Sequence, residues 1–304
     1  MREQTRIRGV CPVLAVPFTE AGDVDLDSFA AMVQHVLATG VSAVMLFGFA
    51  SEFYKLRDDE RTALRRALLG ETRRRDEVAA IISITDHATE VAVRNATDAV
   101  ADGASALNLL PPSLLGPSRR AILDHLAAVL DAVDVPVIVQ YAPALTGTSL
   151  DAQTIRELAA EHPNLRMVKV ESMPPGRLIA NLAAGDPALP SLVGYAGVQL
   201  PDALRRGAVG VQPGCSFTEL YLRVWRDWEA GERESALELH RRLLPYISYW
   251  MQNVELIVHA EKTILARRGI IASERCRKPG WTLDRVERAM IDEFFEEFGA
   301  ALGR

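Results

Sequence analysis

Short apolar runs rich in β-branched residues alternate along the chain with longer segments in which apolar positions recur every three to four residues. A short apolar run between turn residues predicts a buried strand, and the longer period predicts an amphipathic helix. We expect eight strands, at Val10 to Phe18, Ala43 to Phe47, Val78 to Ile84, Ala106 to Leu110, Pro136 to Tyr141, Leu165 to Glu171, Leu192 to Gly194 and Ala208 to Gln212. We expect helices at Leu26 to Thr39, Asp58 to Glu71, Thr89 to Ala101, Ser118 to Ala132 and Asp151 to His162.

Strands that alternate with helices eight times predict an α/β fold, a (β/α)₈ TIM barrel over residues 1–222. Beyond about Phe217 the strand signal ends, and Arg223 to Leu244, Ile247 to Arg268 and Leu283 to Leu302 have a helical pattern. A C-terminal helical domain is therefore expected over residues 223–304. The alternative is an open doubly wound sheet, but no Gly-x-Gly-x-x-Gly follows a strand to support a dinucleotide site.

The composition excludes several classes of partner. A net charge of −6 argues against nucleic acid binding, and the most apolar stretch, Val41 to Ala50, is about half of what a bilayer span needs. Cys11, Cys215 and Cys276 are widely spaced, so neither a disulfide framework nor a zinc site is indicated, and a reducing cytoplasm is the expected location. No His-x-His pair follows a first strand, which disfavours a metal-dependent hydrolase.

Lysine is rare here, because only Lys55, Lys169, Lys262 and Lys278 are lysines among 34 basic residues. Lys169 lies in the sixth strand, and alternation places it on the same face as Glu171, with Val168 and Val170 opposite. An ammonium turned into a barrel is costly unless it is paired or neutral, and a neutral amine attacks carbonyl carbons. The alternative is a structural Lys-Glu pair.

Tyr141 ends the neighbouring fifth strand and has the parity of Val137 and Val139. Consecutive barrel strands are neighbours, so we expect Tyr141 within reach of Lys169, where a phenol can relay protons. A packing role for this tyrosine is the alternative.

The order of these motifs resembles the dihydrodipicolinate synthase and N-acetylneuraminate lyase family, whose members form a Schiff base with pyruvate. The similar blocks are Pro12 to Phe18 with Gly22-Asp23-Val24-Asp25, Gly40-Val41, Gly48 to Glu52, Pro111-Pro112, Tyr141 with Pro143, Thr146 and Gly147, and Lys169. The resemblance implies a barrel with a three-helix C-terminal domain, usually a homotetramer, that needs no metal or cofactor. It also implies that Lys169 forms the imine with a small 2-oxo acid and that Gly48 and Thr146 belong to the substrate site.

Departures from the family pattern limit what carries over. Phe49 and Ala50 replace the two threonines that hold the keto-acid carboxylate, and Ser51 replaces the following glycine. We expect Ser51 and nearby backbone N–H groups, including those of Phe49 and Ala50, to bind the carboxylate instead. Leu145 stands near the place of the synthases' substrate-binding arginine, and the second tyrosine after Pro111-Pro112 is missing.

Glu171 points to a different member of the family. A glutamate two residues after the Schiff-base lysine is similar to the 2-keto-3-deoxy sugar acid dehydratases, in which an acid or base acts beside the imine. The prediction is a lyase, an aldolase or a dehydratase, with Lys169, Tyr141 and Glu171 as catalytic residues. Alternatives are a synthase-type condensation of pyruvate with an aldehyde, or a non-catalytic carboxylate-binding protein.

Three further residues have weaker functional interpretations. Asp86 and His87 follow the third strand and are more simply solvated loop residues than substrate contacts. Glu52 is expected to be a structural anchor rather than a catalytic group.

Overall fold

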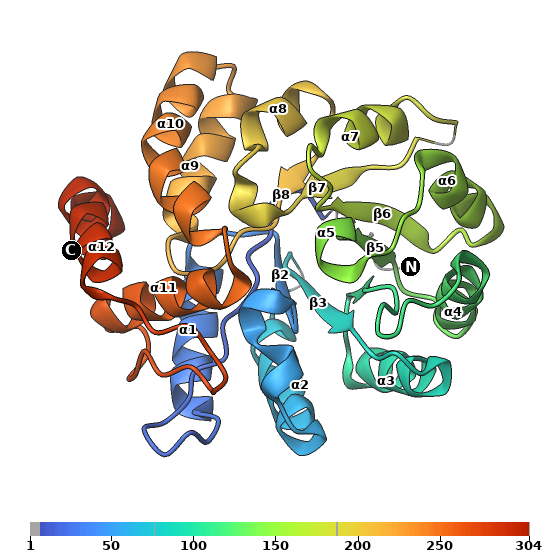
Figure 1. Ribbon diagram of the computed structural model, residues 1–304, viewed down its shortest axis with the longest axis horizontal. Helices are drawn as coiled ribbons and strands as arrows, with labels where there is room; N and C mark the ends of the chain where they lie inside the picture. Colours follow the sequence, from blue (N-terminus) through green and yellow to red (C-terminus); the bar gives the residue numbers. More distant parts are fainter. Residues whose placement is uncertain (1–6, 76, 187, 304) are drawn as a thin grey trace. The chain divides into compact units, whose positions relative to one another are not determined.

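A computed structural model describes residues 7–75, 77–186 and 188–303 (Figure 1). The described residues form two compact units: residues 7–8 with 79–186 and 188–212, and residues 9–75 and 77–78 with 213–303. Each unit contains both strands and helices. The predicted boundary at residues 222 and 223 falls inside helix α9 (Thr218–Glu229), and the two-domain division at that point stays a prediction.

The first unit contains six strands that pair in chain order and in parallel. Apolar β-branched runs form these strands because both faces of the sheet are buried. Helices α3, α4, α6 and α7 lie around β3 to β7 in Figure 1. The strands are β3 (Ala79–Ile84), β4 (Ala106–Leu109), β5 (Val137–Tyr141), β6 (Leu165–Val170), β7 (Ser191–Val193) and β8 (Gly210–Val211), and the helices are α3 (Thr89–Asp102), α4 (Arg119–Asp131), α5 (Pro143–Thr146), α6 (Ala152–Glu161), α7 (Gly176–Ala183), η3 (Tyr195–Gly197) and α8 (Leu200–Arg205).

The second unit contains two strands and the C-terminal helices. Its elements are β1 (Gly9–Val10), α1 (Leu26–Ala38), β2 (Ala43–Leu46), η1 (Phe49–Ser51), η2 (Phe53–Lys55), α2 (Asp58–Thr72), α9, α10 (Arg233–Trp250), α11 (Val254–Arg267), α12 (Arg285–Phe298) and η4 (Gly299–Leu302). Buried aromatic rings join α9, α10 and α12: Phe294 lies 5.1 Å from Phe217 and 5.6 Å from Trp250, centroid to centroid. Such pairs add to the apolar burial that holds these helices together.

The (β/α)₈ TIM-barrel fold with a C-terminal helical extension is confirmed, because eight strands alternate with helices and further helices follow. The five helices predicted between strands begin and end within one residue of α1, α2, α3, α4 and α6. The first predicted strand is too long, since only Gly9–Val10 forms a strand, and Val13 and Phe18 make isolated bridges.

The predicted C-terminal helices required correction. Arg223 to Leu244 is interrupted, because the chain turns at Gly231 with a φ of +85° and α10 begins at Arg233. Ile247 to Arg268 is also interrupted, since α10 ends at Trp250 and the side chain of Asn253 caps the N-terminus of α11. The last predicted helix, from Leu283, begins two residues later at Arg285 and continues as η4 after Phe298.

Candidate active site

A buried ion pair lies at the carboxyl end of β6 in the first unit. Lys169 and Glu171 are 3% and 7% exposed, and the Lys169 Nζ lies 3.3 Å from the Glu171 Oε1. The backbone N–H of Glu171 donates to the Tyr141 carbonyl at 2.8 Å, which fixes the end of β6 against β5. The predicted proximity of Lys169 and Glu171 is therefore confirmed. A buried carboxylate next to an amine can exchange a proton with it directly.

A chain of polar side chains that the sequence analysis missed extends from this pair across β5, β4 and β3. The Gln140 Nε2 donates to the Glu171 Oε2 at 2.6 Å, and the Asn108 Nδ2 donates to the Gln140 Oε1 at 2.8 Å. The Asn108 Nδ2 also donates to the Ser83 Oγ at 3.1 Å. These three residues are at most 2% exposed. A signal did exist, since each of these otherwise apolar strands carries one polar residue near its carboxyl end.

Tyr141 lies at the end of β5 but pairs in register with Val170, whereas Gln140 pairs with Lys169. Residues paired in register share a face of the sheet, so alternation places Tyr141 on the face of the valines. Within residues 79–186 no hydrogen bond joins the Tyr141 hydroxyl to Lys169 or Glu171. Tyr141 is 8% exposed at the strand end, and its catalytic role stays a prediction.

The loop after β7 contacts Glu171 through a glycine. A Cβ added to Gly194 would lie 2.4 Å from the Glu171 Oε1, so only glycine leaves room for the carboxylate. The next two residues, Tyr195 and Ala196, have left-handed φ values of 50° and 49°, a conformation that costs free energy for residues other than glycine. Burial, and then the negative charge of Glu171, raise the pKa of the half-buried Tyr195 phenol. Tyr195 is a second phenol beside this carboxylate, and the sequence analysis did not identify it.

In the second unit, the segment Gly48 to Ser51 forms a tight turn with a fully buried Ser51. The Ser51 Oγ donates to the Leu14 carbonyl at 2.6 Å and accepts from the Phe47 N–H at 3.1 Å. The Ser51 N–H donates to the Gly48 carbonyl at 2.9 Å. The only proton of the Ser51 hydroxyl is thus used on the Leu14 carbonyl. The predicted carboxylate contacts at Gly48, Phe49, Ala50 and Ser51 stay predictions.

Glu52 is an anchor in the second unit, in agreement with the prediction. Both its oxygens accept from ammonium groups: Lys262 binds Oε1, and Lys55 binds Oε2 at 2.9 Å. The Lys262 ammonium also lies 4.1 Å from the centroid of the Phe18 ring. Burial, despite the opposing charge of Glu52, lowers the pKa of Lys262. Lys169 is therefore one of two fully buried amines among the described residues, and its neighbours rather than its burial distinguish it.

The remaining candidates are used in local contacts. The Thr146 Oγ1 donates to the Ala142 carbonyl at 3.0 Å and accepts from the Thr148 N–H at 3.2 Å. The Asp86 Oδ2 accepts from the Asn95 Nδ2 at 2.9 Å, and the His87 Nδ1 accepts from the Ser113 N–H at 3.2 Å. These contacts fit the loop roles expected for Asp86 and His87, while substrate binding by Thr146 stays a prediction.

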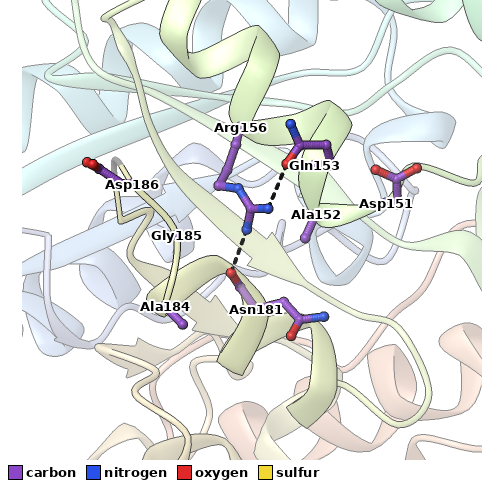
Figure 2. Close-up of a pocket in the computed structure, with 8 residues that line it drawn as sticks. All are labelled: Asp151, Ala152, Gln153, Arg156, Asn181, Ala184, Gly185 and Asp186. Carbon is purple, nitrogen blue, oxygen red and sulfur yellow. Dashed lines mark hydrogen bonds between the residues drawn. The ribbon is translucent and has the colours of Figure 1, made fainter.

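A surface depression of the first unit lies between α6 and the end of α7 (Figure 2). Its central guanidinium, Arg156, donates to the Asn181 carbonyl at 2.7 Å and to the Gln153 Oε1 at 2.9 Å. None of its lining residues belongs to the predicted site. Over the described residues, no group of three or more His, Cys, Asp or Glu side chains is arranged to hold a metal ion. Nor does the described part of the chain contain a helix long and apolar enough to cross a membrane.

Comparisons of the chain with known proteins show which family it belongs to. L-2-keto-3-deoxyarabonate dehydratase from Azospirillum brasilense is 28% identical over 279 residues, covering 90% of this chain and 89% of that protein. 4-Hydroxy-tetrahydrodipicolinate synthase 2 from Streptomyces coelicolor is 28% identical over 295 residues, covering 95% of each. The dihydrodipicolinate synthase structure from Rhodopseudomonas palustris has the same fold, with a TM-score of 0.88 at 24% identity over 95% of this chain and 97% of that one. Residues 6–297 match the model of the dihydrodipicolinate synthetase family, and the chain belongs to that family, as its motifs indicated.

Proposed function

We propose that this protein is a class I lyase in which the Lys169 amine forms an imine with a 2-oxo acid, such as a 2-keto-3-deoxy sugar acid or a pyruvate adduct. The observation that carries the proposal is the buried pair of Lys169 and Glu171, 3.3 Å apart at the end of β6. In (β/α)₈ barrels the carboxyl ends of the strands carry the chemistry. The dehydratase from Azospirillum brasilense is a relative over most of the chain and supports the same class.

The proposed reaction begins when the neutral Lys169 nitrogen attacks C2 of the 2-oxo acid. The carbinolamine loses water and becomes an iminium, which withdraws electrons from C3. Removal of a C3 proton gives an enamine, and the enamine expels a C4 hydroxyl that leaves as water once it is protonated. In aldol cleavage the C4 hydroxyl loses a proton instead, the C3–C4 bond breaks towards the iminium, and an aldehyde departs.

Glu171 is the proposed acid and base for these proton transfers, because its Oε1 faces the amine that becomes the imine nitrogen. Tyr141 is the proposed second proton carrier at the end of β5. The predicted substrate contacts at Gly48, Phe49, Ala50, Ser51 and Thr146 complete the proposal for the keto-acid carboxylate. The chemistry as proposed needs no cofactor.

Borohydride trapping tests the proposal. A panel of 2-oxo acids, from pyruvate to 2-keto-3-deoxy sugar acids, is incubated with the protein and borohydride, and the peptides are analysed by mass. The expected result is a reduced adduct on the Lys169 peptide that is absent from Lys169→Ala. No adduct on that peptide with any acid in the panel would overturn the proposal. The buried amine of Lys262 provides an internal control for non-specific reduction.

Condensation of pyruvate with an aldehyde is the second candidate, since relatives such as the Streptomyces coelicolor protein are 4-hydroxy-tetrahydrodipicolinate synthases. Leu145 near the place of the expected arginine argues against aspartate semialdehyde as the aldehyde. Consumption of pyruvate with aspartate semialdehyde is the discriminating assay, and we expect none. A non-catalytic carboxylate-binding protein would instead bind its ligand equally well after Lys169→Ala.

Assembly and location complete the proposal. We expect a homo-oligomer, a tetramer or a dimer, which light scattering of the purified protein tests directly. We expect it to work in a reducing cytoplasm, consistent with the free thiols of Cys11, Cys215 and Cys276.

A further inference from the structure

We propose that Gln140 is a positioning residue that holds the Glu171 carboxylate in one orientation towards Lys169; this inference rests on the proposed function. The two oxygens of Glu171 have different partners. The Gln140 Nε2 donates to Oε2 at 2.6 Å, while the Lys169 Nζ lies 3.3 Å from Oε1. Oε1 is therefore the oxygen that faces the lysine nitrogen, and Oε2 is the oxygen that holds the carboxylate in place.

The Gln140 amide is also hydrogen-bonded on the side that faces away from Glu171. The Asn108 Nδ2 donates to the Gln140 Oε1 at 2.8 Å, and it also donates to the Ser83 Oγ at 3.1 Å. A flipped Gln140 would direct its NH₂ group at a donor and its carbonyl at a carboxylate, which would cost both hydrogen bonds. Gln140, Asn108 and Ser83 are buried, so water does not compete for these groups. In this arrangement the Gln140 amide donates to Glu171 and accepts from Asn108.

With Oε2 held by Gln140, Oε1 is directed at the nitrogen that becomes the imine. A carboxylate in this orientation can accept the C3 proton and return it to the departing C4 hydroxyl. Gln140 thus sets the orientation in which the carboxylate begins the reaction. The titratable groups beside the Glu171 side chain are Lys169 and Tyr195, while Tyr141 contacts Glu171 through its backbone carbonyl.

Gln140→Met tests this inference, because methionine keeps the length of the side chain and removes the donor. We expect turnover to fall about tenfold to a hundredfold, as is typical when the partner of a working residue is lost. Borohydride trapping at Lys169 should persist, and the loss should lie in kcat with KM nearly unchanged. Gln199→Met, at an exposed glutamine just before α8, is the matched control and should leave all three readouts unchanged.

A double-variant cycle with Glu171→Gln separates positioning from packing. If Gln140 acts through Glu171, the double variant is no slower than Glu171→Gln alone. Losses that multiply in the double variant, or a wild-type kcat in Gln140→Met, would overturn the inference.

A measurement that does not depend on turnover tests this inference separately from the proposed function. Infrared difference spectroscopy, with Glu171→Gln as the reference, follows the carboxylate of Glu171 directly. We expect its stretching bands to shift in Gln140→Met because Oε2 loses its donor, and unchanged bands would refute the role of Gln140. Failure of the wild-type protein to trap any 2-oxo acid would overturn the proposed function, while the infrared bands would still decide what Gln140 does to Glu171.

Discussion

Gln140 and Lys169 are register partners on neighbouring strands, and their nitrogens meet the two oxygens of the same carboxylate, that of Glu171. The amine and the amide approach from the same face of the sheet. An amine with one buried carboxylate at 3.3 Å has a local proton acceptor that is shielded from solvent.

Glu171→Gln should reduce turnover about a hundredfold or more, the usual contribution of an acid or base. Imine formation should fall much less, because the nucleophile remains and glutamine fills the same volume. Single-turnover trapping at Lys169 and steady-state turnover, measured on the same preparation, give the two rates. Glu157→Gln on the exposed side of α6 is the control. Equal losses in the two rates would make Glu171 a structural partner of Lys169.

Gly194→Ala should abolish most of the turnover while the protein stays folded. The added Cβ would lie 2.3 Å from the Glu171 Cγ and 2.4 Å from Oε1, so the carboxylate must move away from Lys169. Active-site groups displaced by about 1 Å commonly lose about a hundredfold in rate. Gly70→Ala in α2, where a Cβ meets nothing within 4 Å, is the matched control and should be neutral. Wild-type turnover in Gly194→Ala would show that the carboxylate does not need its present position.

The strands could be predicted because each is a short apolar run between turn residues, and their parity placed Lys169 with Glu171. The partner of Lys169 on β5 could not be predicted in the same way. The register shifts between Val137 and Ile138, and this shift brings Gln140 rather than Tyr141 opposite the lysine. A bulge of this kind depends on backbone packing between two strands and leaves no pattern within either of them.

The backbone conformation of the loop after β7 is a second feature that could not be predicted from the sequence. Left-handed φ values at Tyr195 and Ala196 are unusual for residues other than glycine. The sequence Gly194-Tyr195-Ala196 therefore did not predict them. The break at Gly231 was missed for a related reason, because the amphipathic pattern continues on both sides of it.

Tyr195→Phe and Tyr141→Phe distinguish the two phenols. Tyr195 lies in the loop packed against Glu171, so loss of its hydroxyl should slow turnover about tenfold or more and alter the pH–rate profile. Tyr141→Phe should slow imine formation itself if this tyrosine is the proton carrier of the family pattern. Rates of borohydride trapping and of turnover for each variant provide the comparison. If Tyr141→Phe keeps the wild-type rates of trapping and turnover, Tyr141 has a packing role only.

Lys262→Met should destabilise the second unit by about 3–5 kcal/mol, because the fully buried Glu52 loses one of its two ammonium partners. Adding Glu52→Gln should recover part of that loss, since the remaining amide carries no unpaired charge. Urea unfolding at pH 7 measures both free energies of unfolding. A double variant less stable than Lys262→Met would contradict the view that the unpaired charge is what costs stability.

Glu261 is the group whose titration should be visible in the stability of the protein. Its carboxyl is buried on α11 against Gly214 and accepts from the Ser216 N–H at 2.9 Å, and burial raises its pKa to about 6. Because an unfolded glutamate releases its proton near pH 4.5, the folded state holds the proton more tightly. The stabilising contribution is complete below about pH 4.5 and is lost as the pH rises through 6. The loss amounts to about 2 kcal/mol at pH 8.

Glu261→Gln removes this titration and keeps an acceptor for the Ser216 N–H. The variant should therefore gain about 2 kcal/mol over the wild type at pH 8 and differ little from it at pH 4.5. Denaturant unfolding at the two pH values measures the difference, and Glu293→Gln on α12 is a control for general loss of charge. A stability gain that is equal at both pH values would show that packing, rather than the buried charge, distinguishes the two side chains.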